Sequence, residues 1–191
     1  MKELVEAICK QGVGVGTDVV KVDMFLNHRL DTALYVKMGQ AFADAFLEYQ
    51  PEIVLTVEAS GIAAAITTAM ACGNIPVVFA KKSPTRNVTG DVYESRVYSF
   101  THGVENHIRV DKEYLPKGAK VLVVDDFLAN GEAAEGLCDL VNQSGGEVIG
   151  VGICVEKSFQ PGRQKLQDLG YRVISLAKIT GIVDGKLQVK E

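Results

Sequence analysis

The most regular feature of the chain is a set of short apolar runs that alternate with longer segments of helical spacing. The runs are rich in Val and Ile and lack the polar alternation of a half-exposed strand, which is typical of strands buried on both faces. They lie at 53–57, 76–80, 120–126 and 147–156, with further strands expected at 172–179 and 186–189 and a hairpin at 96–100 and 107–110. Strands that alternate with helices predict an α/β fold with a doubly wound parallel sheet.

Helical segments are expected between the apolar runs, and turn residues mark their ends. Asp31 is the expected N-cap of a helix in which apolar residues recur at helical spacing until Pro51 stops it. Pro161 opens a later helix and Gly170 closes it. The expected helices are 2–11, 31–51, 62–72, 131–143 and 161–169.

The first 30 residues or so fall outside this repeat. The glycine-rich segment 12–16 is interpreted as a hinge or turn. Residues 19–28 are predicted to form a strand, because Val20, Val22 and Met24 alternate with other residues. We expect one domain over residues 1–191, in which residues 1–30 form a small cap, or hood, over the strand ends.

Composition narrows the class of protein. Hydrophobic residues make up 47% and charged residues 23% of the 191 residues, and no apolar run reaches the ~20 residues of a membrane helix. The formal net charge of −4 argues against nucleic acid as the main partner. The four cysteines have no CxxC spacing and are expected to be reduced, and the charged N-terminus is unlike a secretory signal. We therefore expect a cytoplasmic protein that binds neither membrane nor nucleic acid.

The candidate chemistry lies in residues 121–133, VLVVDDFLANGEA. Asp125 and Asp126 follow a buried strand, at the edge where parallel α/β sheets bind ligands. Packing does not require two adjacent carboxylates there, whereas the vicinal hydroxyls of a sugar are donors that ionised carboxylates accept well. The loop after them exposes backbone N–H groups at a helix N-terminus, which suits a phosphate. The pattern predicts a ribose 5-phosphate site.

Three other classes share parts of this pattern and fit less well. A Walker B strand looks similar, but the chain has no GxxxxGK[ST] loop for nucleotide hydrolysis. Response-regulator receiver domains carry paired aspartates near the start of the domain, whereas Asp126 lies about two thirds of the way along this chain. The glycines at 12–16 lack the GxGxxG spacing of a dinucleotide site.

The motif resembles the signature of the type I phosphoribosyltransferases, which is an apolar strand, two acidic residues, a loop of small residues and a helix. The resemblance implies a sheet of that kind, with Asp125 and Asp126 as catalytic residues that bind the ribose hydroxyls of phosphoribosyl pyrophosphate (PRPP). It implies that the following loop binds the 5-phosphate through Ala129, Asn130, Gly131, Glu132 and Ala133. The commoner family loop has Thr where Asn130 and Ala133 stand, so backbone N–H groups are expected to do more of the binding. Glu132 is expected to point to solvent.

Two further segments are similar to the family's elements for the pyrophosphate of PRPP. Small residues at Ala59, Ser60 and Gly61 follow a strand and allow the backbone to approach a polyanion. Lys81 and Lys82 begin the polar segment 81–95, which also holds Arg86 and is expected to be the family's mobile catalytic loop. A lysine pair in a loop is ordinarily solvated, but the resemblance implies that it clamps pyrophosphate.

The base is expected to be a 6-oxopurine. In purine-specific members of the family a lysine after a buried strand donates to the oxygen at C6, and an aromatic residue stacks on the base; Lys157 and Phe159 match them. The chain is similar over its full length to the bacterial subgroup that acts on xanthine, which implies that Val20 and Asn27 also line the base pocket. The Asn27 amide can donate to the oxygen at C2.

The resemblance implies purine salvage, in which the 5-phosphoribosyl group passes from PRPP to xanthine and gives xanthosine 5′-monophosphate and pyrophosphate. Mg²⁺ is the implied cofactor, bound with PRPP and pyrophosphate rather than by a protein cage. A homodimer is the implied assembly. Guanine or hypoxanthine stays open as the base, because Lys157 interacts with the 6-oxo group alone. A PRPP-sensing regulator without catalysis also stays open, although no basic recognition helix is evident.

Overall fold

The computed structural model describes residues 1–82, 91–99 and 104–190. Its helices are α1 (Lys2–Gln11), α2 (Thr32–Phe46), α3 (Gly61–Ala71), α4 (Glu132–Ser144) and α5 (Gly162–Asp168). Its strands are β1 (Val13–Val15), β2 (Val19–Lys21), β3 (Ile53–Val57), β4 (Val77–Ala80), β5 (Val92–Ser99), β6 (Val104–Asp111), β7 (Lys120–Leu128), β8 (Glu147–Lys157), β9 (Val173–Val183) and β10 (Lys186–Lys190). A π-helical turn spans Asp23–Asn27, and 3-10 turns span Leu47–Tyr49 and Lys112–Tyr114.

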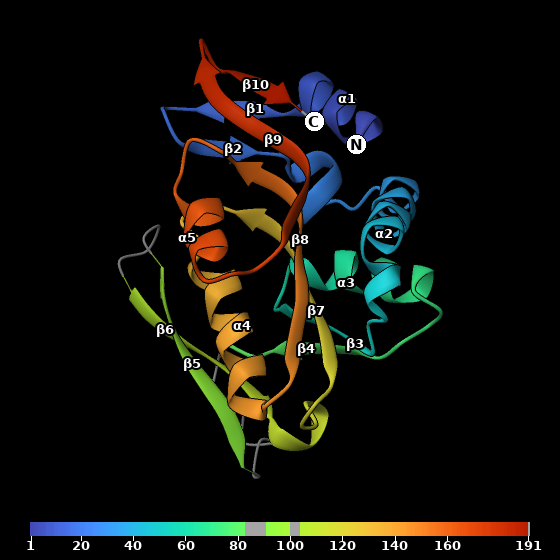
Figure 1. Ribbon diagram of the computed structural model, residues 1–191. Coiled ribbons are helices and arrows are strands. Elements are labelled where there is room, and N and C mark those ends of the chain that lie inside the picture. The colour runs from blue at the N-terminus through green and yellow to red at the C-terminus, as the bar shows by residue number, and fades with distance from the viewer. Residues whose placement is uncertain (83–90, 100–103, 191) are drawn as a thin grey trace.

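The predicted α/β architecture is confirmed. In the described residues the main sheet has six strands in the order β10-β9-β8-β7-β3-β4, and each neighbouring pair is parallel except β10 with β9. Helices α2 and α3 cover one face of the sheet, and α4 and α5 cover the other (Figure 1). The β5-β6 hairpin lies beside α4, outside the main sheet. Within the described ranges, no helix has the length and apolar character needed to cross a membrane.

The central strands are buried on both faces, which explains their continuous apolar sequences. In β3, Val54 belongs to the core under α2 and α3, whereas Leu55 belongs to the core under α4. Leu122 and Val123 of β7 repeat this division, and β3 and β7 pair in parallel. The carboxyl ends of the two strands therefore meet at the same edge of the sheet.

The hood over this edge draws on both ends of the described chain. Helix α1 packs on β10, and the β1-β2 hairpin contacts β9 and β10. The backbone N–H of Gly14 donates to the Gly185 carbonyl at 2.9 Å. Figure 1 shows α1, β1, β2 and β10 together beyond the carboxyl ends of β7 and β8. The hood therefore consists of the expected residues 1–30 together with part of residues 173–190.

Two predictions within the hood were wrong. Residues 12–16 contain strand β1 rather than a hinge, and a Cβ on Gly14 would come within 2.3 Å of Ile182 Cγ2, so the glycine lets β1 pack closely on β9. Residues 19–28 do not form one strand, because β2 ends at Lys21 and the π-helical turn follows. Phe25 and Leu26 are adjacent and both buried, which differs from the one-sided burial that the alternation of Val20, Val22 and Met24 predicts.

Two other boundaries differ from expectation. The loop predicted for 81–95 is shorter, because β5 begins at Val92, and Arg86 lies outside the described residues. Strand β7 continues to Leu128, two residues beyond the predicted end of the strand at Asp126. The predicted N-cap is confirmed, since Asp31 Oδ1 accepts the Leu34 N–H at 3.1 Å.

Candidate active site

Two adjacent carboxylates lie close to the end of β7. Asp125 and Asp126 are 4% and 7% exposed, and the N–H of Asp126 donates to Asp125 Oδ1 at 3.0 Å. The charge of Asp126 reaches Tyr35 of α2, whereas Asp125 borders Gly61 at the start of α3. The acidic pair therefore lies next to the turn after β3.

The environment of Asp125 opposes its charge. Burial raises the pKa of Asp125 well above its ordinary value, and the neighbouring charge of Asp126 raises it further. The Asp126 N–H and the positive charge of Lys82 act in the opposite direction. Burial has removed the water that would solvate these carboxylates. A ligand whose hydroxyl groups donate hydrogen bonds to the pair, or a cation beside it, replaces that lost solvation.

The loop after β7 has the geometry of an anion site. Ala129, Asn130 and Gly131 connect β7 to α4, and Glu132 and Ala133 begin the helix. Gly131 has a φ of 95°, in the left-handed region that favours glycine. The first turn of α4 leaves backbone N–H groups without intrahelical partners at the carboxyl edge of the sheet. The loop's predicted role in binding a 5-phosphate stays a prediction that this geometry supports.

Glu132 differs from expectation because it does not simply point to solvent. Its side chain is 20% exposed, and the Lys165 ammonium lies 3.3 Å from Glu132 Oε1. This pair ties the first residue of α4 to α5. The negative charge that would otherwise repel a phosphate is balanced by a lysine from the neighbouring helix.

The turn after β3 lies against the acidic pair. A Cβ on Gly61 would come within 2.7 Å of Asp125 Oδ1 and 2.2 Å of Thr56 Oγ1. Ala59 and Ser60, which precede it, are exposed and half-buried. The Thr56 hydroxyl is buried and has no hydrogen-bond partner in the described part of the chain. The structure thus brings the predicted pyrophosphate turn and the predicted ribose residues to one place.

The two lysines after β4 have different surroundings. Lys81 exchanges backbone hydrogen bonds with Arg109 of β6, at 2.9 and 3.0 Å. The backbone N–H of Lys82 donates to the Glu58 carboxylate at 2.6 Å, which fixes it beside the turn after β3. The charge of Lys82 reaches Asp125, so this lysine is the positive group that the structure places near the acidic pair.

The predicted base residues gather around the hood. Lys157 is the last residue of β8, and its ammonium donates to the Asp18 carbonyl, in the turn between β1 and β2, at 2.8 Å. Burial lowers the pKa of Lys157, and the charge of Asp18 opposes that effect. Val20 of β2 is partly buried on the same hairpin. Asn27 and Phe159 are exposed, and no hydrogen bond among the described residues joins Asn27 to Lys157.

The segment after Lys157 packs on the loop of residues 129–133, the predicted phosphate loop. The N–H of Gly162 donates to the Ala129 carbonyl at 3.0 Å. A Cβ on Gly162 would come within 2.4 Å of that carbonyl oxygen and 2.8 Å of the Gly131 nitrogen. The two backbones therefore touch, and the absent side chain of Gly162 is what permits it.

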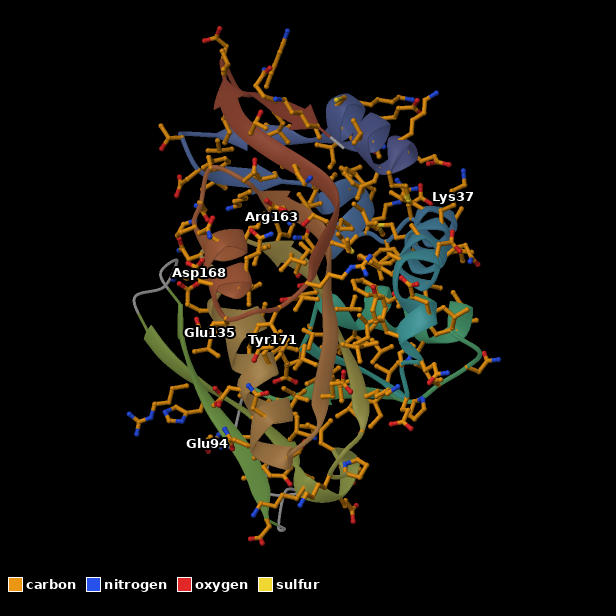
Figure 2. The ribbon with its side chains drawn as sticks, viewed as in Figure 1. Lys37, Glu94, Glu135, Arg163, Asp168 and Tyr171 are labelled. Carbon is orange, nitrogen blue, oxygen red and sulfur yellow. The ribbon has the colours of Figure 1, made fainter. Side chains whose placement is uncertain are left out.

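A buried ion pair anchors the same segment. Glu156 is 2% exposed, and both of its carboxylate oxygens accept from Arg163, at 2.6 to 2.9 Å. Arg163 also donates to Ser175 Oγ at 2.9 Å and to the Val173 carbonyl at 3.1 Å, so α5 is tied to β8 and β9 (Figure 2). Burial alone would raise the pKa of Glu156, but hydrogen bonds from Arg163 and Ser175 outweigh it and hold the pKa below the ordinary value.

Replacing Arg163 by methionine should lower the free energy of unfolding by about 3 kcal/mol at neutral pH, because it leaves a buried carboxylate without its partner. A depressed pKa stabilises the fold above the ordinary carboxyl pKa, and this stabilisation is lost as the pH falls through the folded-state pKa. The difference between wild type and variant should therefore shrink as the pH falls below the ordinary carboxyl pKa of 4.5 in urea unfolding experiments.

The double variant Arg163→Met/Glu156→Gln is the control for this prediction. It removes the stranded charge and should recover much of the lost stability. Equal losses in the single and double variants, or a loss that does not depend on pH, would show that the charge of Glu156 is not the cause.

Sequence reasoning missed several residues that shape the site. Tyr35, Gly162 and Asp18 act through a buried hydroxyl or through the backbone, which no residue pattern reveals. The ion pair of Glu156 had a weak signal, because a carboxylate at the end of a buried apolar strand needs a partner. Arg163 is a candidate partner for this carboxylate, because it lies in the first turn of the helix that follows.

The fold and the site together define an α/β protein with adjacent buried carboxylates and a loop of small residues at the carboxyl edge of its sheet. Residues 29–185 match the family model of the phosphoribosyl transferase domain. The chain is 46% identical to xanthine phosphoribosyltransferase of Laribacter hongkongensis over 187 residues, which cover 98% of both proteins. It is also 46% identical to xanthine phosphoribosyltransferase 1 of Clostridium perfringens over 190 residues and the full length of both.

The solved structures agree with this assignment of fold. Adenine phosphoribosyltransferase from Rhodothermus marinus superimposes with a TM-score of 0.73 at 20% identity, over 94% of this chain and all of that one. The chain belongs to the phosphoribosyl transferase family and has the fold of its type I members, as predicted. It is an enzyme of the glycosyltransferase class.

Proposed function

We propose that the protein transfers the 5-phosphoribosyl group of PRPP to xanthine in purine salvage, giving xanthosine 5′-monophosphate and pyrophosphate. The observation that carries this proposal is the 46% identity to xanthine phosphoribosyltransferases over the whole chain. The lysine that the proposal assigns to the base lies at the end of β8, against the hood.

Donor and acceptor chemistry indicates which class of purine base the site accepts. An ammonium donates hydrogen bonds and accepts none. Lys157 therefore suits the C6 oxygen of an oxopurine, whereas the C6 amino group of adenine would leave two donors facing each other. The adenine phosphoribosyltransferase structure from Rhodothermus marinus shares the fold at 20% identity, so it does not decide the base.

The residues of the site divide the work of the reaction. Asp125 and Asp126 accept hydrogen bonds from the ribose hydroxyls, while the loop of 129–133 holds the 5-phosphate. The turn of 59–61 and Lys82 hold the pyrophosphate as it leaves C1 of the ribose, and N9 of the base then attacks C1. Lys157 orients the base for that attack. Positioning and electrostatic stabilisation supply the catalysis, with no covalent bond to the enzyme.

We also propose Mg²⁺ as the cofactor. Carboxylate oxygens are the protein ligands that Mg²⁺ prefers, and the buried pair of Asp125 and Asp126 offers them at the carboxyl edge of the sheet. When bound with PRPP, the ion supplies positive charge that offsets the charge of the leaving pyrophosphate. Lys82 contributes fixed positive charge to the same region.

A cytoplasmic homodimer is part of the proposal. All four cysteines are free thiols and three of them are buried, as is typical of a reducing compartment. Ile66 and Met70 lie one turn apart on α3 and are 46% and 60% exposed, which gives a second copy an apolar face to cover. Analytical ultracentrifugation tests the dimer, and a single species with the mass of one chain at micromolar concentration contradicts it.

Guanine or hypoxanthine is the competing substrate, because both carry the same C6 oxygen that Lys157 contacts. Asn27 is the proposed discriminator, since its amide can donate to the C2 oxygen that distinguishes xanthine from hypoxanthine. The alternative from another class, a PRPP-sensing regulator without catalysis, finds no support among the full-length relatives, which are named as transferases.

The deciding experiment measures pyrophosphate release from PRPP and Mg²⁺ with xanthine, guanine, hypoxanthine or adenine supplied in turn. Turnover should be fastest with xanthine and absent with adenine. Lys157→Met should lower kcat/KM for every oxopurine by about a hundredfold, because the hydrogen-bond donor to the base is lost. Lys117→Met, at an exposed site near the opposite end of β7, is the control and should behave as wild type. A preference for guanine or hypoxanthine would overturn the assignment of the base, and PRPP binding without turnover would overturn the assignment as an enzyme.

A further inference from the structure

Asn27 stands at the end of the π-helical turn after β2, and the residues just before it are anchored in the core. Phe25 and Leu26 are 1% and 0% exposed and belong to the core under α2 and α3. The N–H of Arg29 donates to the Asp23 carbonyl at 2.8 Å, which closes the turn. Asn27 is the last residue of the turn, and its side chain is exposed. The position of this side chain is therefore set by the backbone that precedes it.

A buried tyrosine from another element holds that backbone. Tyr35 lies in the first turns of α2, is 2% exposed, and its hydroxyl donates to the Leu26 carbonyl. The Leu26 carbonyl and the Asn27 N–H belong to one planar peptide unit. A hydrogen bond that fixes the carbonyl therefore fixes the orientation of the unit on which Asn27 stands.

The charge of Asp126 also reaches this tyrosine. Burial raises the pKa of Tyr35, and the groups of Cys154 and Asp126 raise it further. Its hydroxyl therefore keeps its proton over the physiological range and donates to the Leu26 carbonyl.

We propose that Tyr35 is a positioning residue for base specificity, which acts by holding the Leu26–Asn27 peptide so that the Asn27 amide meets the C2 oxygen of the base. The inference rests on the proposed function, in which Asn27 contacts xanthine. It adds a residue that does not touch the substrate and that the sequence motifs did not indicate.

The substitution Tyr35→Phe tests this, because it removes the hydroxyl and keeps the ring with its packing. The KM for xanthine should rise about tenfold, as expected when one hydrogen bond no longer fixes its group. The KM values for PRPP and for hypoxanthine, which has no C2 oxygen, should stay within about twofold of wild type. The preference for xanthine over hypoxanthine should fall accordingly.

A double-mutant cycle with Asn27→Ala shows whether Tyr35 acts through Asn27. Asn27→Ala alone should raise the KM for xanthine, and Tyr35→Phe should add nothing further in that background. Additive effects overturn the inference, as does a Tyr35→Phe variant that loses turnover with both bases alike, because that pattern indicates a purely structural role. An unchanged KM for xanthine in Tyr35→Phe overturns it as well.

Tyr171→Phe is the matched control. Its hydroxyl accepts a hydrogen bond from Asn142 at 2.8 Å, and it lies beside α4 and α5, away from the hood (Figure 2). It should leave all three KM values unchanged. Failure of the proposed function is seen separately, in a wild-type enzyme that does not use xanthine. If the wild type uses xanthine but the effects of the two substitutions are additive, only the role of Tyr35 is contradicted, and the proposed function stands.

Discussion

Replacing Asp125 and Asp126 together by asparagine should slow turnover by at least about a hundredfold and, at the same time, raise the melting temperature of the ligand-free protein. Asparagine keeps the shape of each side chain but is a weaker acceptor for the ribose hydroxyls. The gain in stability arises at Asp125, where burial and then the charge of Asp126 raise the pKa of the carboxyl group. A neutral amide removes that cost of ionisation.

The pH dependence of the melting temperature identifies the cause. Because the folded-state pKa of Asp125 is raised, the protonated form stabilises the fold at low pH, and this stability is lost as the pH rises through the folded-state pKa. The advantage of Asp125→Asn over wild type should thus be absent near about pH 3 and grow toward about pH 8 in calorimetry.

Asp168→Asn is the control for the acidic pair, because this carboxylate is exposed at the end of α5 (Figure 2). It should change neither turnover nor the pH dependence. Wild-type turnover in the double variant would falsify the assignment of the ribose site. A melting temperature that falls at every pH would instead show that the pair stabilises the fold.

Gly162→Ala should raise the KM for PRPP by about a hundredfold, because the new methyl group collides with the backbone of the phosphate loop. The Ala129 carbonyl and the Gly131 nitrogen lie 2.4 and 2.8 Å from the position of the new Cβ. Backbone atoms in a turn that includes a left-handed glycine cannot move aside as a flexible side chain does. The loop must shift, and the backbone N–H groups that we propose hold the 5-phosphate shift with it.

Steady-state kinetics over a range of PRPP concentrations measure this effect. Gly181→Ala is the matched control, because a Cβ at Gly181 of β9 meets nothing within 4 Å. That variant should retain wild-type kinetics. If Gly162→Ala and Gly181→Ala had the same KM for PRPP, the contact between Gly162 and the phosphate loop would not affect PRPP binding.

The sequence predicted the sheet well and indicated the residues proposed for PRPP, because both inferences depend on local pattern. Continuous apolar runs marked β3, β7 and β8, since strands buried on both faces need no polar positions. Asp125 and Asp126 stood out because a buried strand has no packing reason to hold adjacent carboxylates. The small residues before α3 and α4 marked the two turns, since close approach of a backbone excludes larger side chains.

The hood was predicted poorly because its structure depends on contacts between distant residues. Gly14 is a strand residue on account of Ile182, which lies almost at the other end of the chain. The turn that carries Asn27 is fixed by Tyr35 of the next helix rather than by its own sequence pattern. The alternation of Val20, Val22 and Met24 predicted a longer strand than β2, and tertiary contacts overrode that local preference after Lys21.

The hood unites residues 1–30 with β9 and β10, and this has a consequence for how the protein is made. During synthesis, residues 53–144, which supply β3, β7, the acidic pair and the phosphate loop, leave the ribosome before residues 173–190 do. The first residues of the chain must then wait for β10 before α1 and β1 gain their packing partners. Nascent chains should acquire the surfaces for PRPP before they acquire a complete pocket for the base.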